Sequence, residues 1–258
     1  MTVDYELRGH IAVMTINRPG ARNAVNTDVA QGMEAAIDQL EADEDAWVGI
    51  ITGARTEKGW IFCAGADLKQ MRTDPGGMST PKGGFAGFVQ RERTKPVIAA
   101  VDGPALAGGT EIVLACDLVV ASETAVFGIP EVKRNLVAGA GGLFRLPRKI
   151  PRNIAMELAL TGRLDFPAEQ AHRFGLVNHL SAEGEALARA IELAEQVTEA
   201  APLAVRESRQ VILAATDEPD EVGWKMSGEA MMKMFGTEDF TEGLAAFVEK
   251  RPPAWKGR

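Results

Sequence analysis

Residues 97–121 read VIAAVDGPALAGGTEIVLACDLVVA, and they carry the clearest structural signal in the chain. The segment begins and ends with short apolar runs, 97–101 and 118–121, and each run predicts a buried strand. The apolar stretch 112–116 between them is too short for a typical crossover helix. We therefore expect two strands joined by an unusually tight connection that contains a glycine pair.

The residues before this segment predict a strand, a helix and a second strand. The runs HIAVMTI at 10–16 and WVGIIT at 47–52 are short, apolar and rich in β-branched residues. Thr27 is placed to cap the intervening helix, with Asp28 in its first turn. The helix itself is indicated by apolar residues at helical spacing, namely Val29, Met33, Ala36, Ile37 and Leu40. This succession indicates a crossover unit and a partly parallel sheet.

After about residue 150 the strand signal stops and helical patterns follow. One amphipathic helix carries Leu187, Ile191, Ala194 and Val197, and Pro202 opens another. Thr237 is expected to cap a further helix, with acidic residues in its first turn and Pro252 after its end. The sequence predicts an α/β core over residues 1–200 and an all-helical C-terminal part over residues 201–258.

Charge and composition exclude several functional classes. The chain of 258 residues has a net charge of −8, which disfavours a broad nucleic-acid or anionic-membrane surface. The first residues, MTVDYEL, resemble no signal or transit peptide, and no apolar stretch is long enough to cross a membrane. Cys63 and Cys116 are expected to be buried, reduced thiols. Together these features predict a soluble cytoplasmic protein.

Two polar segments have open interpretations. Residues 72–85 are rich in Gly, Pro, Ser and Thr, and they predict a mobile loop that is either a substrate lid or a disordered insertion. The basic cluster Arg145, Arg148, Lys149 and Arg152 is interpreted as a solvated helix face and not as a polyanion site.

The glycine pair lies in GPALAGGT at 103–110, which nearly matches a phosphate-binding P-loop. Gly109 stands where the P-loop requires lysine, and the dinucleotide fingerprint is also absent, so nucleotide chemistry is not expected. Paired glycines before a helix leave backbone N–H groups open, and such groups can stabilise an oxyanion. Taken alone, the pair is better explained as a tight turn that requires positive φ.

Glu111 is the strongest candidate for acid–base chemistry. Its helical neighbours Leu114 and Ala115 are apolar, so its carboxylate is expected on an apolar face, where burial raises the pKa. Glu131, in FGIPEVK at 127–133, reads by itself as an ordinary loop residue. The two carboxylates can meet only through tertiary structure. The three histidines, His10, His172 and His179, lack metal-ligand spacing.

Read together, several segments resemble the enoyl-CoA hydratase/isomerase (crotonase) family over essentially the whole chain. Each motif is modest alone, but their order and spacing are specific. The segments are INRPGARNAV at 16–25, FCAGADL at 62–68, ALAGGTE at 105–111, ACDLVVA at 115–121, FGIPE at 127–131, GAGG at 139–142, GLVN at 175–178 and FVEKR at 247–251.

The resemblance implies a crotonase-like α/β fold, a ββα superhelical spiral, that binds a coenzyme A thioester. It implies an oxyanion hole formed by the N–H groups of Ala64 and Gly108, with Glu111 and Glu131 holding the attacking water. Glu111 would take the proton of the water, and Glu131 would protonate the α-carbon. No separate cofactor is expected, because coenzyme A is part of the substrate. The implied coenzyme A contacts are Arg22, Ala24, Ala66, Asp67, Leu68 and, from a neighbouring subunit, Phe247 and Lys250.

Members of this family are commonly trimers or dimers of trimers that pack through their C-terminal helices, so a homotrimer or hexamer is expected. Keeping both glutamates favours hydration of a 2-enoyl-CoA. Carnitinyl-CoA dehydration, isomerisation, thioester hydrolysis and non-catalytic acyl-CoA binding remain alternatives. The chain departs from the frequent GGGxE motif at Ala107, which is expected to be tolerated if its φ is negative. It also lacks the GxxP pattern before GAGG, which leaves the acyl chain undefined.

Overall fold

The computed structural model describes residues 2–258, and its centre is a six-stranded sheet with the order β1-β2-β3-β6-β8-β11. β1 (Val3–Arg8) pairs antiparallel with β2 (Ile11–Ile16), and every later neighbour in the sheet is parallel. The remaining strands are β3 (Val48–Gly53), β6 (Val97–Val101), β8 (Leu118–Ser122) and β11 (His179–Ser181). The predicted α/β class with a parallel sheet is confirmed.

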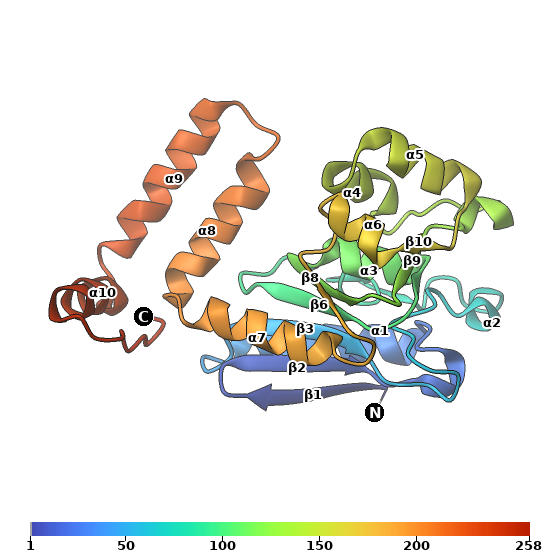
Figure 1. Cartoon of the computed structure of the whole chain (residues 1–258), viewed down its shortest axis with the longest axis horizontal. Coiled ribbons are helices and arrows are strands. Elements are labelled where there is room, and N and C mark those ends of the chain that lie inside the picture. Colours follow the sequence, from blue (N-terminus) through green and yellow to red (C-terminus); the bar gives the residue numbers. More distant parts are fainter. Residues whose placement is uncertain (1) are drawn as a thin grey trace.

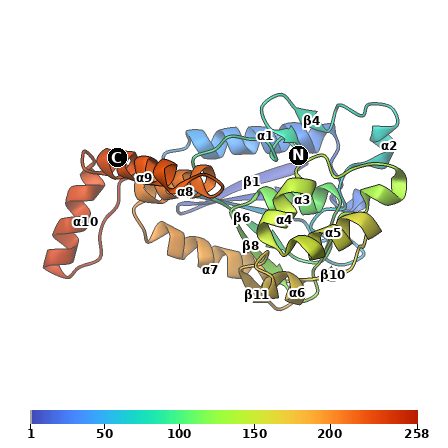
Figure 2. The ribbon, with the colours of Figure 1, turned by 90° about the horizontal axis from the view of Figure 1, so that it is seen from above.

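Two helices cover opposite faces of this sheet (Figures 1 and 2). Alternation along β2 produces the two layers, because Met14 and Ile16 join the cluster that includes α1 (Thr27–Ala42), whereas Ile11 and Val13 join the cluster with α7 (Ala186–Thr198). All five apolar residues predicted for the first helix are buried on α1. The helix begins one residue earlier than predicted, because Asn26, and not Thr27, accepts the Val29 N–H as its cap.

A smaller sheet lies beside the main one and has the order β10-β9-β7. It consists of β7 (Ala105–Leu106), β9 (Val126–Gly128) and β10 (Phe166–Pro167). The expectation of no strand after residue 150 is therefore wrong for β10 and β11. Both strands are two or three residues long, too short to show an alternating pattern.

Between β6 and β8 the chain forms only β7 and the eight-residue helix α3 (Gly108–Ala115). The tight connection that the sequence predicts between these strands is therefore confirmed. The remaining helices and strands around the main sheet are short. They are α2 (Leu68–Met71), β4 (Ser79–Thr80), β5 (Gly84–Phe85), α4 (Gly142–Lys149), α5 (Arg152–Thr161) and α6 (Ala168–Arg173).

The C-terminal part is helical and extends away from the sheet (Figure 1). It contains α8 (Pro202–Ala215), α9 (Asp220–Met234) and α10 (Glu238–Glu249), and Thr237 caps α10 as predicted. The α9 helix was not predicted. Asp239 accepts the N–H groups of Lys256 and Gly257, both at 2.8 Å, and so ties the C-terminal tail to α10. Within residues 2–258, no helix combines the length and the apolar character that crossing a bilayer requires.

Candidate active site

The site begins where β7 ends and α3 starts. Ala107 lies between them with φ 53° and ψ −127°, so the negative φ under which alanine was expected to be tolerated is not present. The surroundings hold this conformation, because the Ala107 N–H donates to Gly128 O at 2.8 Å and its carbonyl accepts the Glu111 N–H at 3.2 Å. A non-glycine residue in such a region stores strain of ~1–3 kcal/mol.

Close approach explains the two glycines that follow Ala107. A Cβ at Gly109 would lie 2.2 Å from Cys63 O, and one at Gly108 would lie 2.4 Å from the Phe85 ring. The side chain of Thr110 adds a further tie, because its hydroxyl donates to Ala105 O at 2.6 Å and lies 2.9 Å from Gly128 O. The turn is thus fixed against β7 and β9. It places the first N–H groups of α3 where no backbone carbonyl of the helix can accept from them.

One of the two predicted oxyanion donors, Ala64, has its N–H already engaged. The Ala64 N–H donates to Arg22 O at 3.1 Å, which does not fit the predicted role of Ala64. Within residues 2–258 the N–H groups of Ala66 and Gly108 donate to no protein acceptor. The two segments are adjacent, since a Cβ on Gly65 would lie 3.0 Å from Gly108 N. Ala66 was assigned from sequence to coenzyme A binding, and its open N–H was missed.

Glu111 lies on α3 and is 4% exposed. Its Oε1 accepts the Gly142 N–H at 2.9 Å. Burial, and secondarily the charge of Glu131, raises the pKa of Glu111 to about 7, against the opposing effects of the amides of Gly142 and Ala140 and the charge of Arg145. The expected buried carboxylate is therefore present, with a pKa suited to proton transfer near neutrality.

Glu131 reaches the same place through the smaller sheet. β7 and β9 run parallel, so their carboxyl ends lie together; α3 follows β7, and the 3₁₀ turn Glu131–Arg134 follows β9. The charge of Glu131 contributes to the raised pKa of Glu111, so the two carboxylates lie within electrostatic reach of each other. Burial raises the pKa of Glu131, and its Oε2 is buried without a hydrogen-bond partner among the described residues. This oxygen therefore keeps an unused capacity to accept a hydrogen bond.

Five predicted coenzyme A contacts lie on two neighbouring segments. Val25 N donates to Gly65 O and Asp67 N to Val25 O, both at 2.8 Å, so the segments that contain Arg22, Ala24, Ala66, Asp67 and Leu68 run side by side. Arg22 is exposed with φ 56°, and Leu68 is 49% exposed. The Asp67 carboxylate is already engaged, because it caps α2 and pairs with Arg18 at 2.7 Å.

The other two predicted contacts are remote. Phe247 lies on α10 and Lys250 follows it, at the opposite end of the molecule from α2 (Figures 1 and 2). Phe247 is 85% exposed. A single chain does not bring these residues to the segments around Arg22 and Ala66.

The basic cluster and the 72–85 loop both make contacts with the core that the sequence did not predict. Arg145 donates to Val89 O at 2.7 Å and Lys149 to Cys116 O at 3.2 Å, so the cluster is not a solvated face at these two residues. The loop packs through buried Met78, and Gly83 N donates to Glu34. A disordered insertion is therefore wrong for this loop.

Other candidate groups show no catalytic arrangement. Burial raises the pKa of both free thiols, Cys63 and Cys116, to about 12, so neither is an activated nucleophile. Among residues 2–258 no group of three or more His, Cys, Asp and Glu side chains is arranged to hold a metal ion.

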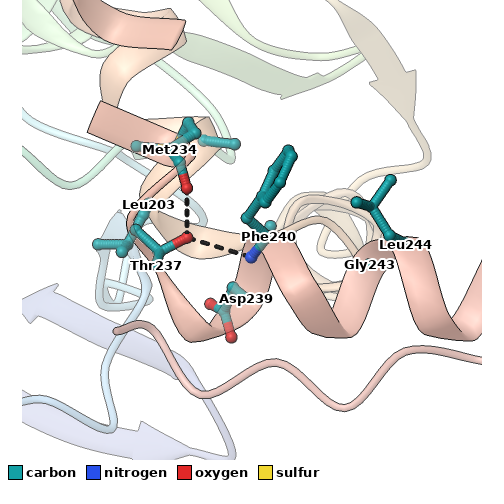
Figure 3. Close-up of a pocket in the computed structure, with 9 residues that line it drawn as sticks. Leu203, Met234, Thr237, Asp239, Phe240, Gly243 and Leu244 are labelled. Carbon is teal, nitrogen blue, oxygen red and sulfur yellow. Dashed lines mark hydrogen bonds between the residues drawn. The ribbon is translucent and has the colours of Figure 1, made fainter. Parts of the chain in front are cut away.

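Two cavities lie away from the carboxylate pair. One of about 230 Å³ lies beside α10, where Met234, Phe240 and Leu244 line it (Figure 3). A groove of about 1730 Å³ runs between α8 and the core and is lined by Arg145 and Lys149 among others. Neither cavity is lined by Glu111 or Glu131.

Comparisons with known proteins agree with this geometry. A family model described as enoyl-CoA hydratase/isomerase matches residues 6–258. The chain is 41% identical to enoyl-CoA hydratase EchA19 of Mycobacterium tuberculosis, over 98% of this chain and 96% of that protein. It is 38% identical to carnitinyl-CoA dehydratase of Salmonella typhi, over 97% and 96%. The crystal structure of enoyl-CoA hydratase EchA1 from Mycobacterium marinum superposes with a TM-score of 0.94 at 47% identity, covering 100% of this chain and 99% of that one.

Proposed function

The chain belongs to the enoyl-CoA hydratase/isomerase family, and from that premise we propose that it is an enoyl-CoA hydratase. It adds water reversibly across the double bond of a 2-enoyl-CoA to form a 3-hydroxyacyl-CoA. The observation that carries the proposal is the pair of carboxylates: buried Glu111, with a pKa of about 7, lies within electrostatic reach of Glu131. A hydration needs one group to accept a proton and another to donate one, and the two glutamates supply both.

In the proposed mechanism Glu111 accepts a proton from water as the water oxygen bonds to the β-carbon. The pKa of about 7 leaves much of Glu111 ionised at neutral pH, as a general base must be. Glu131, whose pKa burial also raises, gives a proton to the α-carbon. The water oxygen, one proton from water and one proton from Glu131 thus enter the product, and the proton on Glu111 returns to solvent or to Glu131.

Negative charge that develops on the thioester oxygen during attack requires hydrogen-bond donors. We place this oxyanion hole at the N–H groups of Ala66 and Gly108, with Ala66 in place of Ala64. Support comes from the two amides being without protein acceptors on adjacent segments, while the Ala64 N–H is used by Arg22 O. Removing one donor of this kind costs about 2.7–4 kcal/mol in the transition state.

The substrate enters as a coenzyme A thioester, and no additional cofactor or metal takes part. The segments around Arg22, Ala24 and Ala66–Leu68 are proposed to bind the coenzyme A moiety. Their support is adjacency to the open amides and the exposed Arg22 and Leu68 side chains. Asp67 acts indirectly in this proposal, since its carboxylate caps α2 and pairs with Arg18.

A homotrimer, or a hexamer made of two trimers, is proposed for the assembly, with the C-terminal region 201–258 as its main contact. Large apolar side chains on these helices are exposed in the single chain, including Trp224 at 78%, Phe247 at 85% and Val248 at 79%. Phe247 and Lys250 would then reach the coenzyme A site of a neighbouring subunit. The buried free thiols support a reducing, cytoplasmic location.

A carnitinyl-CoA dehydratase is the second candidate, favoured by the full-length similarity to such an enzyme. The same two glutamates would then remove water instead of adding it. To test the proposal, crotonyl-CoA and longer 2-enoyl-CoA esters are mixed with the protein, and the absorbance of the enoyl thioester is followed. Absorbance should fall with at least one ester. Isomerisation of a 3-enoyl-CoA without hydration of any 2-enoyl-CoA would show that the hydratase assignment is wrong.

A further inference from the structure

The guanidinium of Arg145 packs against the 139–142 turn, and this turn donates a hydrogen bond to Glu111. Arg145 is on the first turn of α4, and its Nη1 is 3.4 Å from Ala140 O. Gly141 has φ 113°, and a Cβ there would lie 2.4 Å from the same Nη1. The next residue, Gly142, donates its N–H to Glu111. The arginine therefore packs on the backbone that supplies the carboxylate with its hydrogen bond.

A second contact ties this turn to another part of the chain. Arg145 Nη2 donates to Val89 O at 2.7 Å, and Val89 is buried in the segment that follows β5. That segment is itself anchored on α1, because Arg91 pairs with Asp38, and Lys82, just before β5, pairs with the same carboxylate. One guanidinium thus joins the Ala140 and Val89 carbonyls, which lie 51 positions apart in the sequence.

We propose that Arg145 is a positioning residue for Glu111, fixing the 139–142 turn against the segment around Val89 so that the Gly142 N–H meets the carboxylate. The guanidinium has a fork of donors that can hold two carbonyls at once, which an ammonium on a flexible stem cannot do in the same geometry. The role of Glu111 as base rests on the proposed function, whereas the role of Arg145 in the geometry of the turn does not.

Charge gives Arg145 a second effect on Glu111. Its positive charge lowers the pKa of Glu111, against the larger raising effects of burial and of the Glu131 charge. Burial lowers the pKa of Arg145, but arginine stays protonated in proteins. Other charged or titratable groups close enough to act electrostatically at this place are Glu131 and Arg134 on the 3₁₀ turn, Arg93 before β6, Cys116 after α3, and Arg148 and Lys149 on α4.

The test compares Arg145→Met with Arg145→Lys and with Arg148→Met. Arg148 is a matched control, because it lies on the same helix with a 61% exposed side chain, where it pairs with Asp217 and lies over the Phe144 ring. Three quantities are measured for each protein: kcat and KM with crotonyl-CoA, the pH dependence of kcat/KM, and hydrogen exchange by mass spectrometry in peptides that cover residues 138–146.

For Arg145→Met we expect kcat to fall by ~10–100-fold with KM little changed, since small misplacements of a reacting group have effects of this size. The acid limb of kcat/KM should move to higher pH, and the 138–146 peptides should exchange faster. Arg145→Lys keeps the charge, so the acid limb of kcat/KM should stay at the wild-type pH while kcat remains reduced. If Arg145→Met does not fold, the proposal is tested with Arg145→Lys alone. Arg148→Met should match the wild type in all three measurements.

If the 138–146 peptides of both Arg145 variants exchange hydrogen at the wild-type rate, the proposal is wrong, whatever happens to kcat. If the wild-type protein hydrates no 2-enoyl-CoA, the proposed function fails, and the exchange measurement still decides whether Arg145 fixes the turn. Faster exchange in both Arg145 variants but not in Arg148→Met would then support it.

Discussion

The N–H of Gly142 donates a 2.9 Å hydrogen bond to Oε1 of Glu111, a carboxylate 31 residues earlier in the chain. The contact joins the first residue of α4 to the first turn of α3, so a helix N-terminus faces a buried acid. A Cβ at Gly142 would lie 3.1 Å from the same Oε1 and 2.9 Å from the Ala138 Cβ. The glycine thus allows the amide to approach the carboxylate that we propose as the base.

Replacing Glu111 by Gln should remove most of the activity and leave the fold intact. The amide keeps the size of the side chain but cannot accept a proton, and a positioned base contributes ~10²–10⁴-fold to the rate. The check is kcat with crotonyl-CoA beside circular dichroism. Glu123→Gln is the control, because Glu123 is exposed next to β8 and should keep wild-type kcat. Equal rates for the two variants would rule Glu111 out as the base.

The stability of the protein should depend on pH through Glu111. Its pKa is about 7 in the folded chain and 4.5 without perturbation, so the protonated carboxyl favours folding. The contribution is fully present below pH 4.5 and is lost as pH rises through 7. Wild-type protein should therefore lose up to about 3 kcal/mol relative to Glu111→Gln over that interval. Urea unfolding at several pH values measures the difference, and a constant difference would contradict the raised pKa.

A methyl group at Gly108 should disturb the site. Its Cβ would lie 2.4 Å from the Phe85 ring, and overpacking of this kind costs ~1–3 kcal/mol. We expect Gly108→Ala to lower both kcat and the melting temperature, and Phe85→Ala in the same chain to restore part of the loss. Gly228→Ala is the matched control: nothing lies within 4 Å of its Cβ on α9, so it should stabilise the helix by about 0.8–1 kcal/mol. Gly108→Ala behaving like this control would exclude the clash.

Relief of strain at Ala107 should stabilise the chain. Its φ of 53° and ψ of −127° suit glycine better than alanine, so Ala107→Gly should raise the free energy of unfolding by about 1 kcal/mol. Ala188→Gly serves as the reference, because Ala188 is exposed inside α7, and this change should lower the same quantity by about 1 kcal/mol. Denaturant unfolding distinguishes the two signs. A loss at both positions would show that Ala107 is not strained.

The fold was predictable wherever an element is long enough to show its period. α1, α7 and the strands β2, β3, β6 and β8 all follow apolar spacing that the sequence displays. β10 and β11 were missed because two or three residues show no alternation, and their pairing partners are distant in the chain. The cap of α1 was displaced by one residue, since Asn26 and Thr27 are both cap-forming types and only backbone geometry separates them.

The site was predictable as a set of residue types but not as a set of contacts. An apolar helical face correctly indicated that Glu111 is buried, whereas only the parallel pairing of β7 with β9 brings Glu131 to it. The open N–H of Ala66 and the engaged N–H of Ala64 depend on which way each amide points, which the FCAGADL motif does not specify. Arg145 was misjudged because its neighbours on α4 are charged, and the carbonyls that it binds come from elsewhere.

The most direct test of hydration follows the water oxygen. The protein is incubated with crotonyl-CoA in H₂¹⁸O, and the products are identified by mass spectrometry, with Glu111→Gln as the inactive comparison. The account predicts 3-hydroxybutyryl-CoA with one ¹⁸O at C3 and an intact thioester. Free coenzyme A with labelled crotonate, or a shifted double bond without any label, would contradict it.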